Sequence, residues 1–223
     1  MFPLYDTART HTFPLVNLTL IFANVLAFFY QLQMGPELLQ TFVLKWGLIP
    51  FRLMGDLTNN WNTIYSSMFL HGGWFHIINN MWVLFIFGDN VEARMGKIKY
   101  LLFYLLSGTA AGLLQTYVLP SSQVPMIGAS GAIAGVLGAY LVLFPTSRVA
   151  SLVPIYFLFT VIQIPAFIYL IFWFVSQLYS GWLSFQGIGG SGIAWWAHIG
   201  GFIFGLVMSF FFANRRRNYY QSY

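Results

Sequence analysis

Long apolar runs, separated by short polar breaks, are the main feature of the hydrophobic pattern along this chain. Six of these runs approach the roughly 20 residues that a helix needs to cross the hydrocarbon core of a bilayer. The expected spans cover about residues 14–33, 74–92, 98–118, 130–145, 165–183 and 195–213. The pattern therefore predicts an all-α polytopic membrane protein, in which residues 14–213 form a bundle of six transmembrane helices.

Two segments between the expected spans are interpreted differently. Residues 34–73 mix charged side chains with tryptophans, and this mixture is typical of a segment that lies in the membrane interface. Pro165 divides the apolar stretch 149–183, so we interpret residues 149–164 as an interfacial or re-entrant lead-in to the fifth span. Residues 184–194 are rich in glycine, which predicts a flexible loop before the last span.

The distribution of basic residues indicates how the spans are oriented. If the N-terminal segment, residues 1–13, lies in the cytoplasm, the inner segments hold eight Lys and Arg residues and the outer segments hold two. This bias follows the positive-inside rule and places the basic tail, residues 214–223, in the cytoplasm as well. A separate span at 149–164 would move Arg215–Arg217 to the outside, which favours six spans.

The composition also indicates a lipid environment, and it excludes some kinds of chemistry. Apolar residues make up 58% of the 223 residues and charged residues only 7%, whereas soluble domains carry about 25% charged residues. The chain has no cysteine, which excludes disulfides and thiolate catalysis. The net charge is +5, but the ten Lys and Arg residues are spread along the chain and form no dense basic patch. We therefore expect a lipid bilayer and membrane proteins as partners, with no nucleic acid, no metal and no cofactor.

Polar side chains within the expected spans are the main candidates for a functional site, because they are costly in lipid. Ser130 opens the fourth span, His198 lies in the first turn of the sixth, and His76 and Asn80 lie in the second. Spans two, four and six all run from outside to inside. The four side chains are therefore expected at a similar depth, within a turn or two of the outer surface.

A serine and a histidine at one depth predict nucleophilic catalysis. A serine hydroxyl attacks poorly until a neighbouring base takes its proton, and histidine is the usual base near neutral pH. His76 and Asn80, four residues apart on one helix face, suit a developing oxyanion together with the backbone N–H of Ser130. None of the five acidic residues is expected near Ser130. The sequence therefore predicts a Ser130–His198 dyad.

Two glycine pairs indicate how these spans approach each other. Gly131 and Gly135 follow Ser130 in the fourth span, and Gly201 and Gly205 follow His198 in the sixth, each with the spacing GxxxG. Small residues at this spacing let helices pack closely in lipid. Close packing of the two spans would bring the serine to the histidine.

Several of these motifs resemble those of rhomboid intramembrane serine proteases. They are GASG at 128–131, HIINN at 76–80, AHIGG at 197–201, and the GxxxExxxG pattern centred on Glu92, which is structural in that family. The resemblance covers about residues 14–213, and the segment MFLHGGWFHIINNMWVLFIFGDNVE is similar to the bacterial branch.

The resemblance implies a serine endopeptidase that cleaves peptide bonds in or next to the transmembrane helices of its substrates. It also implies a multi-pass protein of the bacterial inner membrane with its active site near the extracytoplasmic face. Residues 184–194 would act as a cap and the fifth span as a side gate. Two positions depart from the family. Many members have a Trp-Arg pair in the first loop, where this chain reads Trp61-Asn62-Thr63. Some members also place an aromatic residue against the histidine ring one turn after the nucleophile, where this chain has Ala134, so another group must orient His198.

Alternatives remain for single residues and for the function. Asn80 can simply bond across helices, Ser191 in the glycine-rich loop is a rival nucleophile, and His71 at the mouth of the second span suits a structural or capping role. The main functional alternative is a catalytically inactive rhomboid-like protein that binds membrane helices. A small transporter or channel is disfavoured, because we find no ionisable residue near the middle of a span.

Overall fold

A computed structural model describes the chain except for residues 1, 9, 11, 156–157, 187–191 and 215–223. The rival nucleophile Ser191, the Arg215–Arg217 triplet and the central part of the expected cap loop lie outside the described residues.

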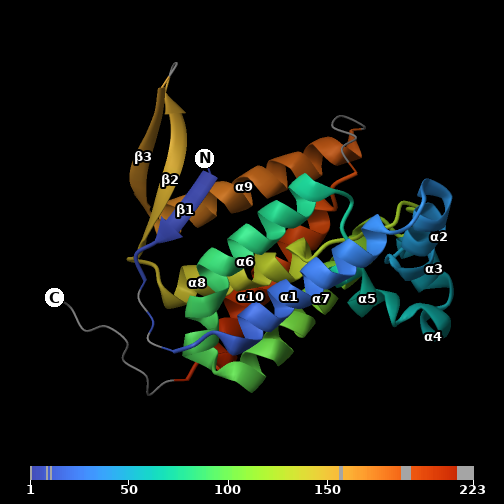
Figure 1. The fold of residues 1–223 in the computed structure, drawn as a ribbon, viewed down its shortest axis with the longest axis horizontal. Helices are drawn as coiled ribbons and strands as arrows, with labels where there is room; N and C mark the ends of the chain where they lie inside the picture. The colour runs from blue at the N-terminus through green and yellow to red at the C-terminus, as the bar shows by residue number, and fades with distance from the viewer. Residues whose placement is uncertain (1, 9, 11, 156–157, 187–191, 215–223) are drawn as a thin grey trace.

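Six long helices in the described part of the chain pack into one bundle (Figure 1), and each occupies one of the apolar runs. They are α1 (Leu15–Leu32), α6 (Trp74–Met95), α7 (Lys97–Val118), α8 (Ser130–Leu143), α9 (Ala166–Phe185) and α10 (Trp195–Phe212). Helix α8 is the central one, since it contacts α6, α7 and α10 along its length. The predicted polytopic helical bundle is confirmed.

Four helices in the described residues are long and apolar enough to cross a membrane: α1, α7, α9 and α10. Helix α8 is equally apolar but has only 14 residues. Helix α6 has 22 residues, and polar side chains interrupt its apolar sequence. Of these, Asn80, Asn90 and Glu92 are buried within the protein. Polar groups are tolerated in a membrane helix when protein rather than lipid surrounds them.

Short helices follow α1 at one end of the bundle (Figure 1). They are α2 (Pro36–Trp46), α3 (Pro50–Gly55), α4 (Leu57–Asn60), α5 (Thr63–Ser66) and the 3₁₀ helix η1 (Ser67–Phe69). Helices α2 and α3 each begin with proline, which is pre-organised for the first helical position. The carboxylate of Asp56 accepts the backbone N–H of Asn59 at 3.1 Å and so caps α4.

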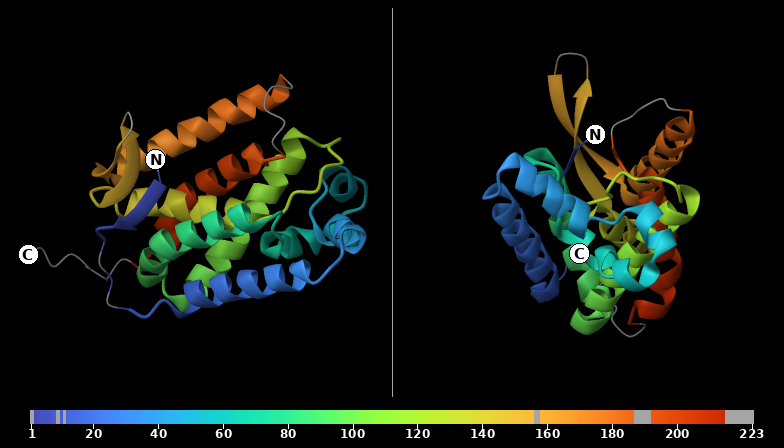
Figure 2. Two further views of the ribbon diagram at one scale, coloured as in Figure 1. Left: turned by 45° about the horizontal axis from the view of Figure 1, so that its top comes forward. Right: turned by 90° about the vertical axis from the view of Figure 1, so that its right-hand side faces the viewer.

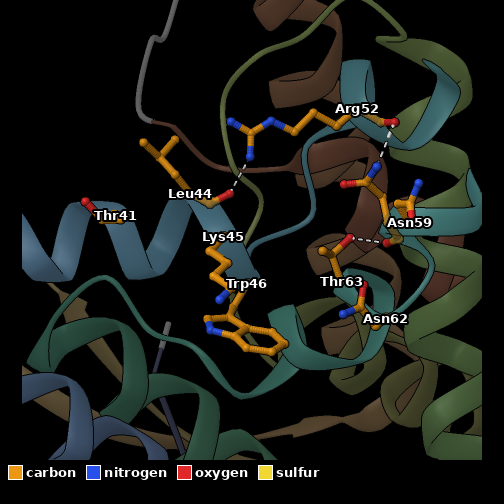
Figure 3. A pocket seen from close by; sticks show the side chains of 9 residues that line it. Thr41, Leu44, Lys45, Trp46, Arg52, Asn59, Asn62 and Thr63 are labelled. Carbon is orange, nitrogen blue, oxygen red and sulfur yellow. Dashed lines mark hydrogen bonds between the residues drawn. The ribbon is translucent and has the colours of Figure 1, made fainter. Parts of the chain in front are cut away.

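Hydrogen bonds to backbone groups hold this first loop together. The Arg52 guanidinium donates to the carbonyl of Leu44 at 2.7 Å, and the Ser66 hydroxyl donates to the carbonyl of Trp46 at 2.7 Å. The same loop surrounds an open cavity of about 520 Å³ (Figure 3). Its lining includes Lys45 and Arg52, and it is separate from the residues that carry the candidate chemistry.

An antiparallel sheet adds to the helical bundle at the end opposite the short helices (Figures 1 and 2). In the described residues its order is β1 (Phe2–Asp6), β2 (Arg148–Ile155) and β3 (Leu158–Pro165). The described residues of the segment 149–164, interpreted from sequence as an interfacial or re-entrant lead-in, belong to the paired strands β2 and β3. A short apolar run does not distinguish strand from helix by periodicity alone, and the pairing of β1 with β2 joins distant parts of the chain.

The N-terminal strand is fastened to the bundle through Asp6. The hydroxyl of Tyr140 and the side-chain amide of Asn90 both donate to the Asp6 carboxylate, the amide at 2.9 Å. Burial raises the pKa of Asp6 to about 7, and the charge of Asp89 acts in the same direction, against the lowering effect of the Tyr140 hydrogen bond. Asp6 therefore joins the sheet to α6 and α8.

The buried carboxylate of Glu92 holds the start of α1. Its oxygens accept the backbone N–H groups of Val16 at 3.1 Å and Asn17 at 2.7 Å. The first turn of a helix leaves such donors without an intrahelical acceptor, and a negative charge there complements the helix dipole. Gly88 allows the close approach, because a Cβ at this position would overlap the Asn17 side chain. Glu92 thus joins α6 to α1.

Glu92→Gln is expected to lower the free energy of unfolding by about 1–3 kcal/mol, because one buried N–H loses its acceptor and the charge is removed. Thermal unfolding in detergent measures this loss of stability, because each kcal/mol lowers the melting temperature of a chain of this size by roughly 2–4 °C. Glu37→Gln is the matched control, since Glu37 is exposed in the first turn of α2. Equal melting temperatures for the two variants would contradict the role of Glu92.

Candidate active site

Ser130 and His198 meet at the starts of two adjacent helices. Ser130 is the first residue of α8, and His198 lies in the first turn of α10. The Oγ atom of Ser130 is 2.8 Å from Nε2 of His198, which is a normal hydrogen-bond distance. A nucleophile and a general base need this reach for direct proton transfer. The structure thus brings together the two side chains that the sequence singled out.

Glycines at the contact between α8 and α10 make this approach feasible. A Cβ at Gly201 would overlap the carbonyl oxygen of Gly131, and a Cβ at Gly205 would overlap the carbonyl oxygen of Gly135. The two glycines of α8 also lie against α7, where a Cβ at Gly131 would come within 2.7 Å of the Ala111 Cβ. Helix α8 is therefore packed closely on both sides.

The other ring nitrogen of His198 contacts a residue that the sequence analysis did not single out. Nδ1 lies 2.8 Å from Oε1 of Gln177, a buried side chain on α9. The indole ring of Trp173, one turn earlier on α9, lies 6.1 Å from the imidazole. Gln177 thus contacts the ring nitrogen of His198 that faces away from Ser130, a contact with His198 that the sequence analysis had not assigned to any residue. Its sequence signal was a polar residue within the apolar fifth span, the same criterion that identified Ser130 and His198.

His76 and Asn80 both face the backbone at Gly128, two residues before Ser130. A Cβ at Gly128 would come within 2.6 Å of His76 Nε2 and 3.6 Å of Asn80 Nδ2, and the φ of +121° there favours glycine. His76 Nδ1 accepts the N–H of Gly72 at 3.3 Å, which assigns the ring proton to Nε2. Asn80 Nδ2 is buried and has no hydrogen-bond partner among the described residues. Two donors therefore point toward the GASG turn.

His71 lies behind these donors. Its backbone N–H donates to the Gln31 side chain at 3.0 Å, and its carbonyl accepts from the same amide at 3.2 Å. The imidazole is buried and packs edge-on against His76, with ring centres 5.0 Å apart. Burial first, and the neighbouring His76 second, lower the pKa of His71 to about 4, so its ring is neutral at neutral pH. This arrangement favours a structural role for His71.

A small cavity adjoins Ser130. Its volume is about 10 Å³, and its lining includes Ser67, Gly128 and Ala197. This is about the space that one water molecule requires. A peptide segment does not fit into it, so binding of a polypeptide at Ser130 requires neighbouring elements to move.

Among the described residues, no acidic side chain extends the serine–histidine pair. Asp6 and its neighbour Asp89 lie close to Tyr140. Tyr140 follows Ser130 by ten residues, or about 15 Å along the helix. The carboxylate of Glu92 is engaged by α1. No group of three metal-ligating side chains was found in the described part of the chain.

Fold and site together define an integral membrane protein with a serine–histidine pair on helices of one bundle. The family model of the Rhomboid domain matches residues 58–215, more than half of the chain, and the protein belongs to the rhomboid family.

Its relatives come from bacteria and from organelles. The chain is 31% identical to the rhomboid protease AarA of Providencia stuartii over 139 residues, which cover 56% of this chain and 49% of AarA. It is 35% identical to the putative rhomboid protease YdcA of Bacillus subtilis over 88 residues, 40% of this chain and 44% of YdcA. It is 26% identical to the mitochondrial rhomboid protein 1 of Saccharomyces cerevisiae over 219 residues, 94% of this chain and 56% of the yeast protein. The chain thus spans about half the length of these relatives.

Proposed function

We propose that this protein is an intramembrane serine endopeptidase that cleaves peptide bonds in or next to the transmembrane helices of membrane-protein substrates. The observation that carries the proposal is the 2.8 Å contact between Ser130 Oγ and His198 Nε2. Membership of a family that includes proteins named as rhomboid proteases supports it.

In the proposed reaction, His198 Nε2 takes the hydroxyl proton while Ser130 Oγ attacks the carbonyl carbon of the scissile bond. His76 Nε2–H, Asn80 Nδ2–H and the Ser130 backbone N–H stabilise the resulting oxyanion. Collapse of the tetrahedral intermediate breaks the C–N bond, and the His198 imidazolium donates its proton to the leaving amine. Water, activated by the same base, then hydrolyses the acyl-enzyme and restores the serine. The unpaired amide of Asn80 supports its part in this scheme.

The proposed orientation places both termini in the cytoplasm and the active site near the extracytoplasmic face of a bacterial inner membrane. The excess of basic residues in the inner segments supports it. Ser130, His198 and His76 all lie near the starts of helices that run inward in this orientation.

Reaction with a fluorophosphonate probe tests the proposal without knowledge of a substrate. The purified wild type is expected to be labelled covalently, and Ser130→Ala is expected to lose at least about 100-fold in labelling rate, because the activated nucleophile is gone. Ser191→Ala is the matched control for the rival serine and is expected to label normally. Labelling that persists in Ser130→Ala would show that another residue is the nucleophile, and absence of labelling in the wild type would favour an inactive helix-binding protein.

A further inference from the structure

The amide of Gln177 is held in one orientation beside His198. Its nitrogen donates to the Ser176 hydroxyl at 3.0 Å and to the Trp173 carbonyl at 3.3 Å. These bonds direct the other end of the amide, Oε1, toward His198 Nδ1 at 2.8 Å. Gln177 is only 6% exposed, so water competes little for these contacts.

This contact determines where the ring proton of neutral His198 resides. An amide oxygen only accepts hydrogen bonds, so Nδ1 must carry the proton. Nε2 is then left with its lone pair, directed at Ser130 Oγ 2.8 Å away. This is the tautomer that a general base requires, and in serine hydrolases a carboxylate usually selects it.

Gln177 belongs to a different helix from either member of the pair. The buried residues of α9 form one narrow seam, namely Ala166, Leu170, Gln177 and Gly181. Figure 2 shows α9 at the edge of the bundle beside α10. A displacement of α9 that opened this seam would therefore remove the acceptor from Nδ1 while leaving Ser130 and His198 on α8 and α10.

We propose that Gln177 is a positioning residue that selects the active tautomer of His198, so that the competence of the base depends on the docking of α9. This inference rests on the proposed protease activity. It assigns to α9 a regulatory contact with the site, made by a neutral amide where a catalytic triad has an acid.

Gln177→Met tests the contact, because it keeps the length of the side chain and removes the acceptor. The turnover number is expected to fall about 10–100-fold, the scale known for groups that orient metal-ligating histidines, while KM changes less than about threefold. Leu178→Met, at a partly exposed neighbouring position on α9, is the matched control and is expected to keep wild-type kinetics.

Gln177→Glu separates positioning from a merely structural role. The glutamate retains an acceptor, so activity is expected to return to within about tenfold of the wild type at alkaline pH. Its charge stabilises the protonated imidazole, so the acidic limb of the rate–pH profile is expected to move to higher pH by about one unit or more.

The outcomes distinguish this inference from the proposed function. If the wild type neither cleaves nor reacts with the fluorophosphonate, the proposed function fails first. If the wild type is active, the inference is overturned when the rate–pH profiles of Gln177→Glu and the wild type have the same acidic limb. Loss of Gln177→Glu activity at every pH, or unchanged turnover in Gln177→Met, overturns it as well.

Discussion

The His198→Ala variant is expected to cleave a transmembrane substrate roughly 10²–10⁴-fold more slowly than the wild type, the scale that general-base catalysis contributes. Without the imidazole, no described side chain is positioned to take the proton from Ser130, whose Oγ bonds His198 Nε2. Cleavage of a reconstituted single-span substrate, followed by gel electrophoresis, measures the rate. The melting temperature of the variant is expected to stay within a few degrees of that of the wild type, because the change removes one partly exposed side chain.

The double variant sharpens this test. Two residues that act as one unit have non-additive effects, so Ser130→Ala with His198→Ala is expected to be about as slow as either single variant. His11→Ala, in the segment before the first span, is the matched control and is expected to cleave normally. A His198→Ala rate within tenfold of the wild type would exclude His198 as the base, whatever the behaviour of Ser130.

Gly205→Leu is expected to have the largest effect on stability. A Cβ at this position would overlap the backbone of Gly135, and backbone in the centre of a bundle cannot rotate aside as a side chain can. Overpacking of this kind commonly costs about 1–3 kcal/mol, or roughly 2–12 °C in melting temperature at this chain length. Because the helices that carry Ser130 and His198 would be wedged apart, fluorophosphonate labelling is expected to fall with stability. Gly201→Leu, against Gly131, should behave in the same way.

Gly55→Leu is the control for the general cost of replacing a helical glycine. Gly55 ends the short helix α3, and apart from its chain neighbours and the backbone of its own helix no described atom lies within 4 Å of a Cβ built there. This variant is expected to keep the melting temperature and the labelling rate of the wild type. If Gly205→Leu and Gly55→Leu behaved alike in both assays, the close contact between α8 and α10 would not support the site.

Much of the site was predictable from sequence, because polar residues are costly in lipid and those within an apolar span are therefore expected to be buried in the protein. A polar residue in an apolar run is conspicuous, and this criterion identifies Ser130, His198, His76 and Asn80 from the sequence alone. The direction of the spans then placed them at one depth. Their catalytic roles stay predictions until the variants are measured.

Gln177 meets the same criterion, but the sequence does not identify its partner, because the partner depends on how α9 is rotated about its own axis. The sheet is not predictable from the sequence for a related reason. The segment 149–164 is short and apolar, and the pairing of its first strand, β2, with Phe2–Asp6 is a contact between distant parts of the chain. The cap on α1 supplied by Glu92 is equally non-local, although the family resemblance had marked this residue as structural.

The sequence by itself determined the bundle of apolar helices and the candidate nucleophile and base, since the cost of placing each residue in lipid is a property of that residue and its immediate neighbours. Only the tertiary structure decided which atoms meet: the glycine contacts that bring α8 to α10, the acceptor on α9 that orients the imidazole, and the carboxylate that caps α1. Those contacts depend on the relative position and rotation of whole helices, and packing sets these quantities only once the full chain has folded.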